Sequence, residues 1–377
     1  MALFARIDAE AGAEKNVFYS PASVEQAFGL LHAGAAGETR AQIERFFGWP
    51  QGEAADMLLA RQRSGLLDHG TQADIRLANA LWLSKGWQFG PGYTGFARQW
   101  YGARVSSLDF SPGLPSQQSA RIINDWAAEE TGGLITDIIT PDQLADSTAA
   151  LLTNALYFNA NWKTELGYGE ERSFLFGDGT DRPFTFMREQ DGFAIASEGG
   201  WSAVRMPYVG DRFAMDVIMP DKRKVVATAP GADVLAALNG KLTAANPSYV
   251  DLQLPRFEID NRNALTDSLK AIGLTLPFDP CNADLSGMTD GAENGLYVSE
   301  AYQITKLQVY EQGTKAAAVT VLRIVPVGGR IIREKPTPFI VDRPFTVVIR
   351  DLKEGTILFV GRIADPQPFE PQRDEDY

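Results

Sequence analysis

Residues 148–158 form an uncharged run that ends in two aromatic residues. Periodicity alone does not separate a buried strand from a buried helix, but the length of the run and its β-rich ends favour the central strand of a sheet. Just before it, the segment 119–131 carries apolar residues at helical spacing and is followed by two glycines. Together the two patterns predict a helix that lies on a sheet.

The order of the remaining patterns predicts an α+β fold. Helical periods dominate the first third of the chain, and short alternating runs split by proline and glycine follow Trp162. The expected helices are residues 23–33, one from about Glu38, 93–101, 119–131 and 264–272. The expected strands are residues 75–83, 105–108, 148–158, 184–187, 201–206, 213–219, 249–254, 257–259, 301–309 and a closing hairpin of 345–350 with 356–360. Because no repeat or low-complexity linker interrupts the chain, we expect a single interleaved domain over residues 1–377.

Composition excludes several classes of partner. The chain has 377 residues, 45% of them hydrophobic, which is enough to bury a large core. Its net charge of -13 has the wrong sign for binding nucleic acid or an anionic membrane surface. No apolar run approaches the ~20 residues of a bilayer-spanning helix. Residues 1–13 are amphipathic rather than an export signal, so we expect a soluble chain from which any signal has been removed, secreted or held in the cell envelope.

Cysteine and histidine are too scarce for most site chemistry. The single Cys281 permits no intramolecular disulfide, and His32 and His69 are too few for a zinc cluster. His32 lies in an apolar helical stretch, which predicts a packed or hydrogen-bonded ring, and His69 lies at a predicted helix end. Neither a G-x-S-x-G motif nor a phosphate-binding glycine loop occurs. We therefore expect no catalytic residues, no metal and no cofactor, and hence a protein that is not an enzyme.

The most informative segment follows the expected strand 301–309. Residues 316–322 are uncharged and rich in small and β-branched residues. In a strand, alternate side chains point to the same face, so one face would carry Thr314, Ala316, Ala318, Thr320, Leu322 and Ile324. The small residues at 314, 316 and 318 would let the segment slide between two existing strands without a steric clash, with Gly313 as a backbone pivot. An ordinary internal strand followed by a turn explains the pattern equally well.

This segment resembles the hinge of the serpin family, E-x-G-T-x-A-A-A-x-T, at residues 311–320. Five further blocks resemble serpin motifs in the same order along the chain. They are NVFYSPAS at 16–23, NALYF followed by Trp162 at 154–162, LPRF at 254–257, DLSGM at 284–288 and FIVDRPF at 339–345. Six ordered blocks from residue 16 to residue 345 make a chance match untenable.

The resemblance implies a fold of three β-sheets and about eight or nine helices, with an exposed reactive-centre loop at about 311–335. It implies a suicide-substrate inhibitor of serine endopeptidases, in which the cleaved loop inserts into a sheet as a new strand while the protease stays covalently bound. The native state would then be metastable. The implied hinge residues are Glu311, Gly313, Thr314, Ala316, Ala317, Ala318 and Thr320.

The resemblance also assigns residues to the region where the sheet opens. Ser20, Ser23 and Asn154 would form the shutter, and Trp162 would lie in the breach where insertion begins. A helix N-cap, a buried hydrogen bond and a core aromatic explain the same residues structurally. Gln303 stands where the family often has histidine, which puts pH gating there in doubt.

The two ends of the loop give different cleavage sites. Counting forward from Gly313 in the family's register places the bond at Val327-Gly328, whose small aliphatic residue suits an elastase-like protease. Counting backward from the 339–345 block places it near Arg333, six residues later. Arg330 and Arg333 therefore remain alternatives for a trypsin-like protease, as does Arg323. Val327 is preferred, because each extra residue before the cut adds ~3.3 Å of slack to the tether.

The main rival function is a non-inhibitory serpin that acts as a binding or structural protein. Bulky or charged hinge residues would favour it, and positions 314, 316 and 318 have none. The only basic pair between residues 60 and 72, Arg61 and Arg63, is interpreted as a solvated helix face, so no heparin-type activator is expected. We expect a monomer, and the abundant alanine and glycine with a single cysteine indicate a bacterial origin.

Overall fold

The computed structural model describes residues 1–68, 70, 73–289, 295–314 and 335–369. These residues form an α+β fold with eight α-helices and two hydrogen-bonded networks of strands. The helices are α1 (Ala2–Ala11), α2 (Pro21–Gly34), α3 (Gly37–Phe47), α4 (Glu53–Leu67), α5 (Pro91–Tyr101), α6 (Leu114–Glu130), α7 (Ala232–Ala244) and α8 (Thr266–Ala271). Within this part of the chain, no helix is both long and apolar enough to cross a membrane.

The first network has nine strands. In spatial order they are β1 (Val17–Tyr19), β15 (Ile357–Ile363), β14 (Phe345–Asp351), β8 (Phe213–Pro220), β7 (Trp201–Pro207), β6 (Asp181–Glu198), β9 (Ser248–Pro255) and β13 (Thr337–Ile340), with β5 (Gly167–Leu175) paired to β6. The expected three sheets appear as two networks because β6 is 18 residues long and belongs to two of them. Its earlier part pairs with β5 and β9, and its last residues pair with β7.

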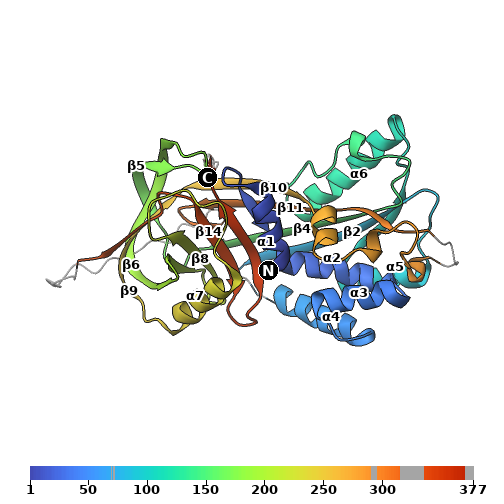
Figure 1. Ribbon diagram of the computed structural model, residues 1–377, viewed down its shortest axis with the longest axis horizontal. Helices are drawn as coiled ribbons and strands as arrows, with labels where there is room; N and C mark the ends of the chain where they lie inside the picture. Colours follow the sequence, from blue (N-terminus) through green and yellow to red (C-terminus); the bar gives the residue numbers. More distant parts are fainter. Residues whose placement is uncertain (69, 71–72, 290–294, 315–334, 370–377) are drawn as a thin grey trace.

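The second network has seven strands among the described residues and contains the uncharged run of residues 148–158. Its order is β16 (Gln367–Pro368), β10 (Phe257–Ala264), β11 (Val298–Tyr310), β12 (Gly313–Thr314), β4 (Ala150–Asn161), β2 (Asp74–Ser84) and β3 (Arg104–Leu108). Alternate residues of β2 and β4 face opposite layers. Trp82 and Ala155 pack with α6, whereas Leu81 and Leu152 pack with α2 and its neighbours. Figure 1 accordingly shows α6 on one side of β4 and β2, and α2, α3 and α4 on the other.

Most sequence predictions for this sheet are confirmed. The uncharged run is strand β4, and the helix expected at 119–131 is α6, which begins five residues earlier and lies on the sheet as predicted. The helix expected at 264–272 is shorter, because Ala264 still pairs with Tyr302 in the ladder of β10 and β11. Helix α7 and the edge strand β5 were not predicted.

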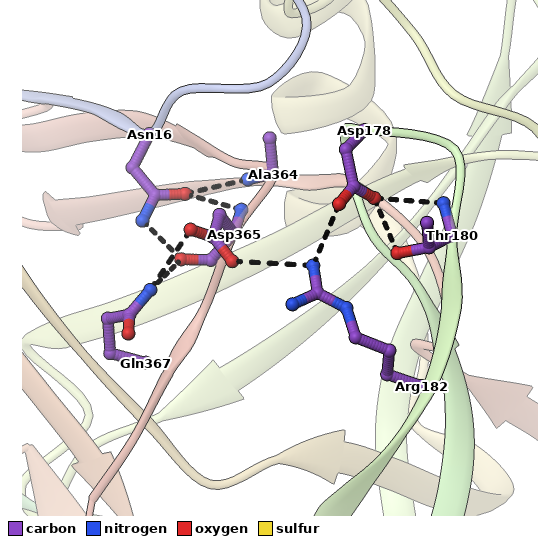
Figure 2. Close-up of polar contacts among 7 residues, drawn as sticks. All are labelled: Asn16, Asp178, Thr180, Arg182, Ala364, Asp365 and Gln367. Carbon is purple, nitrogen blue, oxygen red and sulfur yellow. Dashed lines mark hydrogen bonds and ion pairs between the residues drawn. The ribbon is translucent and has the colours of Figure 1, made fainter.

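The two ends of the chain are joined beside α2. The Asn16 side chain accepts hydrogen bonds from the backbone N–H groups of Ala364 and Asp365, both at 2.8 Å, and donates to the Asp365 carbonyl at 2.6 Å (Figure 2). Arg182 pairs with Asp178 at 3.2 Å and reaches Asp365 at 4.0 Å. Because β1 leads directly into α2, this junction fixes the start of α2 against β15.

Candidate functional site

Strands β4 and β11 are parallel neighbours that pair along only part of their length. Their register runs from Ala150 opposite Val298 to Ala155 opposite Ile304. Beyond that point the short strand β12 lies between them and is antiparallel to both. The pairing of β4 with β11 stops at Ala155 and Ile304, and β12 pairs with Ala160 and Asn161 of β4 and with Val309 and Tyr310 of β11. The two strands therefore part around β12 and present two facing edges to a further strand.

Gly313 allows β12 to enter between these strands. A Cβ atom at this position would lie 2.3 Å from the Ala160 carbonyl oxygen, which no side chain tolerates. The sequence analysis interprets Gly313 as a conformational pivot, but the structure gives a steric reason, the close approach of two backbones.

A buried hydroxyl holds the next residue in place. The side chains of Thr314 and Tyr208 form a hydrogen bond at 2.8 Å, and Thr314 is only 1% exposed. Burial raises the pKa of Tyr208, so its hydroxyl stays protonated. Trp162 stacks on Tyr208 with ring centroids 4.4 Å apart and donates its indole N–H to the Tyr310 carbonyl at 2.9 Å. Trp162 thus lies where β12 enters the sheet, at the position predicted for the breach.

Glu311 is held by both its side chain and its backbone. Its carboxylate lies 3.3 Å from Arg256, and the two side chains are 3% and 14% exposed. Its carbonyl accepts the N–H of Leu166 at 2.9 Å. Within the described residues, Arg256 Nε and Glu311 Oε2 have no hydrogen-bond partner, so the pair is buried but incompletely satisfied.

The predicted shutter residues come together below this entrance. The Ser20 N–H donates to Gln303 Oε1 at 2.9 Å, and Gln303 Nε2 donates to the Ser20 carbonyl at 2.8 Å. The Ser23 hydroxyl donates to Asn154 Oδ1, and Gln303 Nε2 also lies 3.4 Å from this oxygen. All four residues are buried, and none of their side chains titrates near neutral pH. Helix α2, which Ser20 caps, is thereby hydrogen-bonded to both β4 and β11.

One member of the cluster was missed by the sequence analysis. Asn154 Nδ2 donates to Asn79 Oδ1 at 2.6 Å and approaches the Ala78 carbonyl at 3.3 Å. Asn79 is buried in β2, and its Nδ2 has no partner in the described part of the chain. The available signal was an amide in the middle of an otherwise apolar strand, because buried amides require partners.

The geometry limits what the sheet can accept. A strand placed between β4 and β11 would separate them by one more strand spacing, ~4.8 Å. The direct contact between Gln303 and Asn154 could not survive this separation. Helix α2 could then keep its full set of hydrogen bonds to only one of the two strands.

Several predicted residues lie outside the described residues. They are hinge residues Ala316, Ala317, Ala318 and Thr320, the predicted bond Val327-Gly328, and the alternatives Arg323, Arg330 and Arg333. The described chain resumes at Lys335, and β13 pairs with β9, with Phe339 opposite Leu252. The two described ends of this segment, Thr314 and Lys335, therefore lead to different strand networks.

The interpretation of Arg61 and Arg63 as one solvated face is wrong for Arg63. Arg61 is exposed, but the Arg63 guanidinium donates to the Leu77 carbonyl at 3.2 Å and lies against Gly102. Burial lowers the pKa of Arg63. This arginine connects α4 to β2 rather than presenting a free surface charge.

Comparison with known proteins gives a consistent result. The family model described as "Serpin (serine protease inhibitor)" matches residues 1–366. An uncharacterized serpin-like protein of Thermococcus kodakarensis is 31% identical over 95% of this chain and 82% of its own length. Human antithrombin-III is 29% identical over 93% of this chain and 76% of its own. The crystal structure of human thyroxine-binding globulin with its ligand shares the fold, with a TM-score of 0.83, 23% identity and coverage of 97% of this chain and 96% of that one.

Proposed function

Because the chain belongs to the serpin family, we propose that it inhibits serine endopeptidases as a suicide substrate, by inserting its cleaved loop between β4 and β11. The observation that carries this proposal is the position of β12. Gly313 and Thr314 already lie between the two strands and pair with both. If the residues that follow continued in the same direction, they would form a strand between β4 and β11 and replace the direct pairing of the two strands.

The register of β12 predicts where each inserted residue would lie. Thr314 pairs with Ala160 of β4 and with Val309 of β11. Because an inserted strand that continues β12 would be antiparallel to both, Ala316 would lie between Phe158 and Leu307. The same count places Ala318 between Leu156 and Thr305, and Thr320 between Asn154 and Gln303. Directly paired residues on neighbouring strands share a face of the sheet, so these even-numbered side chains would enter the core.

The neighbours of these positions favour small residues. Phe158, Leu156 and Leu307 are buried members of one hydrophobic core cluster. Alanines between them would add little volume, whereas larger side chains would overpack the core. At the third position a threonine hydroxyl would meet the two shutter amides and could replace part of the hydrogen bonding that insertion breaks. Lys315, by contrast, has an odd number and would point to the other face.

The lengths of β4 and β11 support cleavage at Val327. The strands begin at Ala150 and Val298. The same register places Ala150 opposite residue 324 and Val298 opposite residue 325, the difference being the bulge of β11 between Val298 and Glu300, and we count from Ala150. A fully inserted loop would then leave three residues before the bond, a tether of ~10 Å. Cleavage after Arg333 would leave nine residues, or ~30 Å, which is enough slack for the protease to keep an undistorted active site.

The chemistry requires only the protease's own machinery. Its serine oxygen attacks the Val327 carbonyl carbon, the C–N bond to Gly328 breaks, and the amine of Gly328 leaves with a proton. The inhibitor then carries an ester to the protease. Inhibition succeeds if insertion distorts the protease before water hydrolyses that ester. The small side chain of Val327 favours an elastase-like target.

A protease panel tests the proposal. The protein is incubated with an elastase-like and a trypsin-like serine protease, and the products are separated on denaturing gels and by mass spectrometry. We expect a band at the summed mass of inhibitor and elastase-like protease, and a released peptide that begins at Gly328. Val327→Asp should abolish that band, and Arg330→Ala with Arg333→Ala should leave it intact.

Two alternatives have distinct outcomes in the same experiment. A covalent band with the trypsin-like protease and a peptide beginning after Arg330 or Arg333 would move the reactive bond. Complete cleavage with no covalent band for any protease would contradict inhibition and favour a binding role, such as that of the thyroxine carrier that shares the fold. We further infer that residues 1–377 act as one monomeric serpin unit without a heparin-type activator.

A further inference from the structure

A buried histidine connects three helices behind the shutter. His32 on α2 is 1% exposed. Its Nε2 lies 3.0 Å from Glu44 Oε1 on α3, and its Nδ1 lies 3.1 Å from Asp56 Oδ1 on α4. The two carboxylate side chains are 7% and 17% exposed. Both nitrogens of one ring therefore face carboxylates, and each carboxylate comes from a different helix.

The surroundings of this cluster fix both carboxylates. The Gly52 N–H donates to Glu44 Oε1 at 2.7 Å, and the Tyr101 hydroxyl from α5 donates to Asp56 Oδ1 at 3.2 Å. Arg40 on α3 is the charged group that opposes a positive ring. Among the described residues no group of His, Cys, Asp and Glu side chains has an arrangement that could hold a metal ion.

The hydrogen-bond inventory favours a protonated ring. A neutral imidazole has one N–H, so it can donate to only one of the two carboxylates and must turn a lone pair toward the other. The imidazolium donates to both. Burial of the ring opposes protonation, but the hydrogen bonds to Asp56 and Glu44 outweigh it, so the pKa of His32 is raised above its ordinary value.

We propose that His32, Glu44 and Asp56 form a proton-dependent latch that holds α2 in the helical layer and so slows the opening of the sheet. Helix α2 carries Ser20 and Ser23 at its other end, where they bond both β4 and β11. Parting the strands must strain or shift α2. The protonated ring of His32 donates hydrogen bonds to both α3 and α4, whereas the neutral ring can donate to only one of them. The proposal depends on loop insertion as proposed above, but its test uses no protease.

The sign of the pH effect follows from the direction of the shift. A histidine whose folded-state pKa is raised contributes stability that is complete below its unfolded value, ~6.5, and is lost as pH rises through the folded value. The native state should therefore persist longest at mildly acidic pH. The shutter has glutamine at position 303 rather than a histidine, so the latch would add a pH dependence that the contacts of Ser20 and Ser23 with the sheet do not have.

The chain contains two histidines, which makes the test simple. An NMR titration of both imidazoles in the whole protein gives their pKa values, and His69→Gln identifies the signal of His32. The rate of loss of the native state at a fixed elevated temperature is then measured from pH 6 to pH 9 for the wild type, His32→Gln and His69→Gln. His69→Gln is the matched control, because it removes the other histidine by the same substitution.

We expect a His32 pKa above 6.5 and a native state of the wild type and His69→Gln that decays faster at high pH. The acceleration should reach at most about tenfold for each unit by which that pKa exceeds 6.5. His32→Gln should decay at the fast rate with little pH dependence. If this variant does not fold, Glu44→Gln, which removes one carboxylate, should lower the His32 pKa and flatten the profile. A His32 pKa at or below 6.5, or an unchanged profile in the folded latch variant, would overturn the proposal.

Discussion

The substitution Thr314→Arg tests the insertion path at its first buried position. Thr314 is 1% exposed and its hydroxyl bonds Tyr208, so a guanidinium there must either leave the sheet or be buried without a charged partner. An unpaired buried ion costs several kcal/mol, and about 4 kcal/mol is a moderate figure. Since Thr314 already lies between β4 and β11, we expect the arginine to hold residue 314 outside the sheet before cleavage. Burying it during insertion then slows that step about 10³-fold.

That delay changes the outcome of the reaction rather than the affinity for the protease. The acyl-enzyme ester either hydrolyses or is trapped, depending on whether insertion is faster. Insertion that is about 10³-fold slower should therefore convert the protein from an inhibitor to a substrate. Thr314→Val is the matched control, because it keeps the shape of the side chain and loses one hydrogen bond, worth about 1 kcal/mol.

The assay is a titration of a fixed amount of protease with each variant. Residual activity gives the number of inhibitor molecules consumed per protease trapped, and denaturing gels show the ratio of covalent complex to cleaved inhibitor. We expect Thr314→Val to stay close to the wild type and Thr314→Arg to be cleaved without a covalent band. Covalent trapping by Thr314→Arg at the wild-type ratio would refute the argument that residue 314 enters a buried site.

Three further predictions concern the contacts that keep the sheet closed. Glu311→Lys places a second positive charge beside Arg256 and should destabilise the native state by about 3 kcal/mol in denaturant unfolding; Arg256→Glu in the same chain should recover most of the loss, and failure to do so would argue against the pair. Asn154→Ala leaves the Ser23 hydroxyl and Asn79 without their shared partner and should cost about 1–3 kcal/mol, measured as faster decay of the native state; an unchanged rate would contradict a role for the shutter. Gln303→His should add a second pH-dependent step to that decay, checked in the His32→Gln background, where a flat profile would count against it.

The sequence analysis located the sheet because it leaves local signals, whereas the shutter residues were named only through the resemblance to the serpin family. An uncharged strand such as β4 and an amphipathic helix such as α6 are visible in the order of apolar residues. Helix α7 carries a similar signal, since its buried Leu235, Leu238 and Leu242 are spaced at three and four residues. It was missed because the short alternating runs on either side of it led to an interpretation of the whole region as strands.

Other features depend on tertiary structure and could not have been derived locally. The partners of His32 lie 12 and 24 residues away on other helices, so the sequence could predict a hydrogen-bonded ring but not two carboxylates. The steric need for Gly313 arises from the Ala160 carbonyl, which is more than 150 residues distant along the chain. The local sequence could not predict the number of sheets either, because that number depends on where along its length β6 changes partners.

A crystal structure of the protein after cleavage of its loop tests the central claim most directly. The account predicts that β4 and β11 no longer pair and that a new antiparallel strand lies between them, with Ala316 beside Phe158 and Leu307. In the same strand Thr320 should lie between Asn154 and Gln303. A cleaved protein in which Asn154 still lies opposite Gln303, with the cut segment outside the sheet, would contradict it.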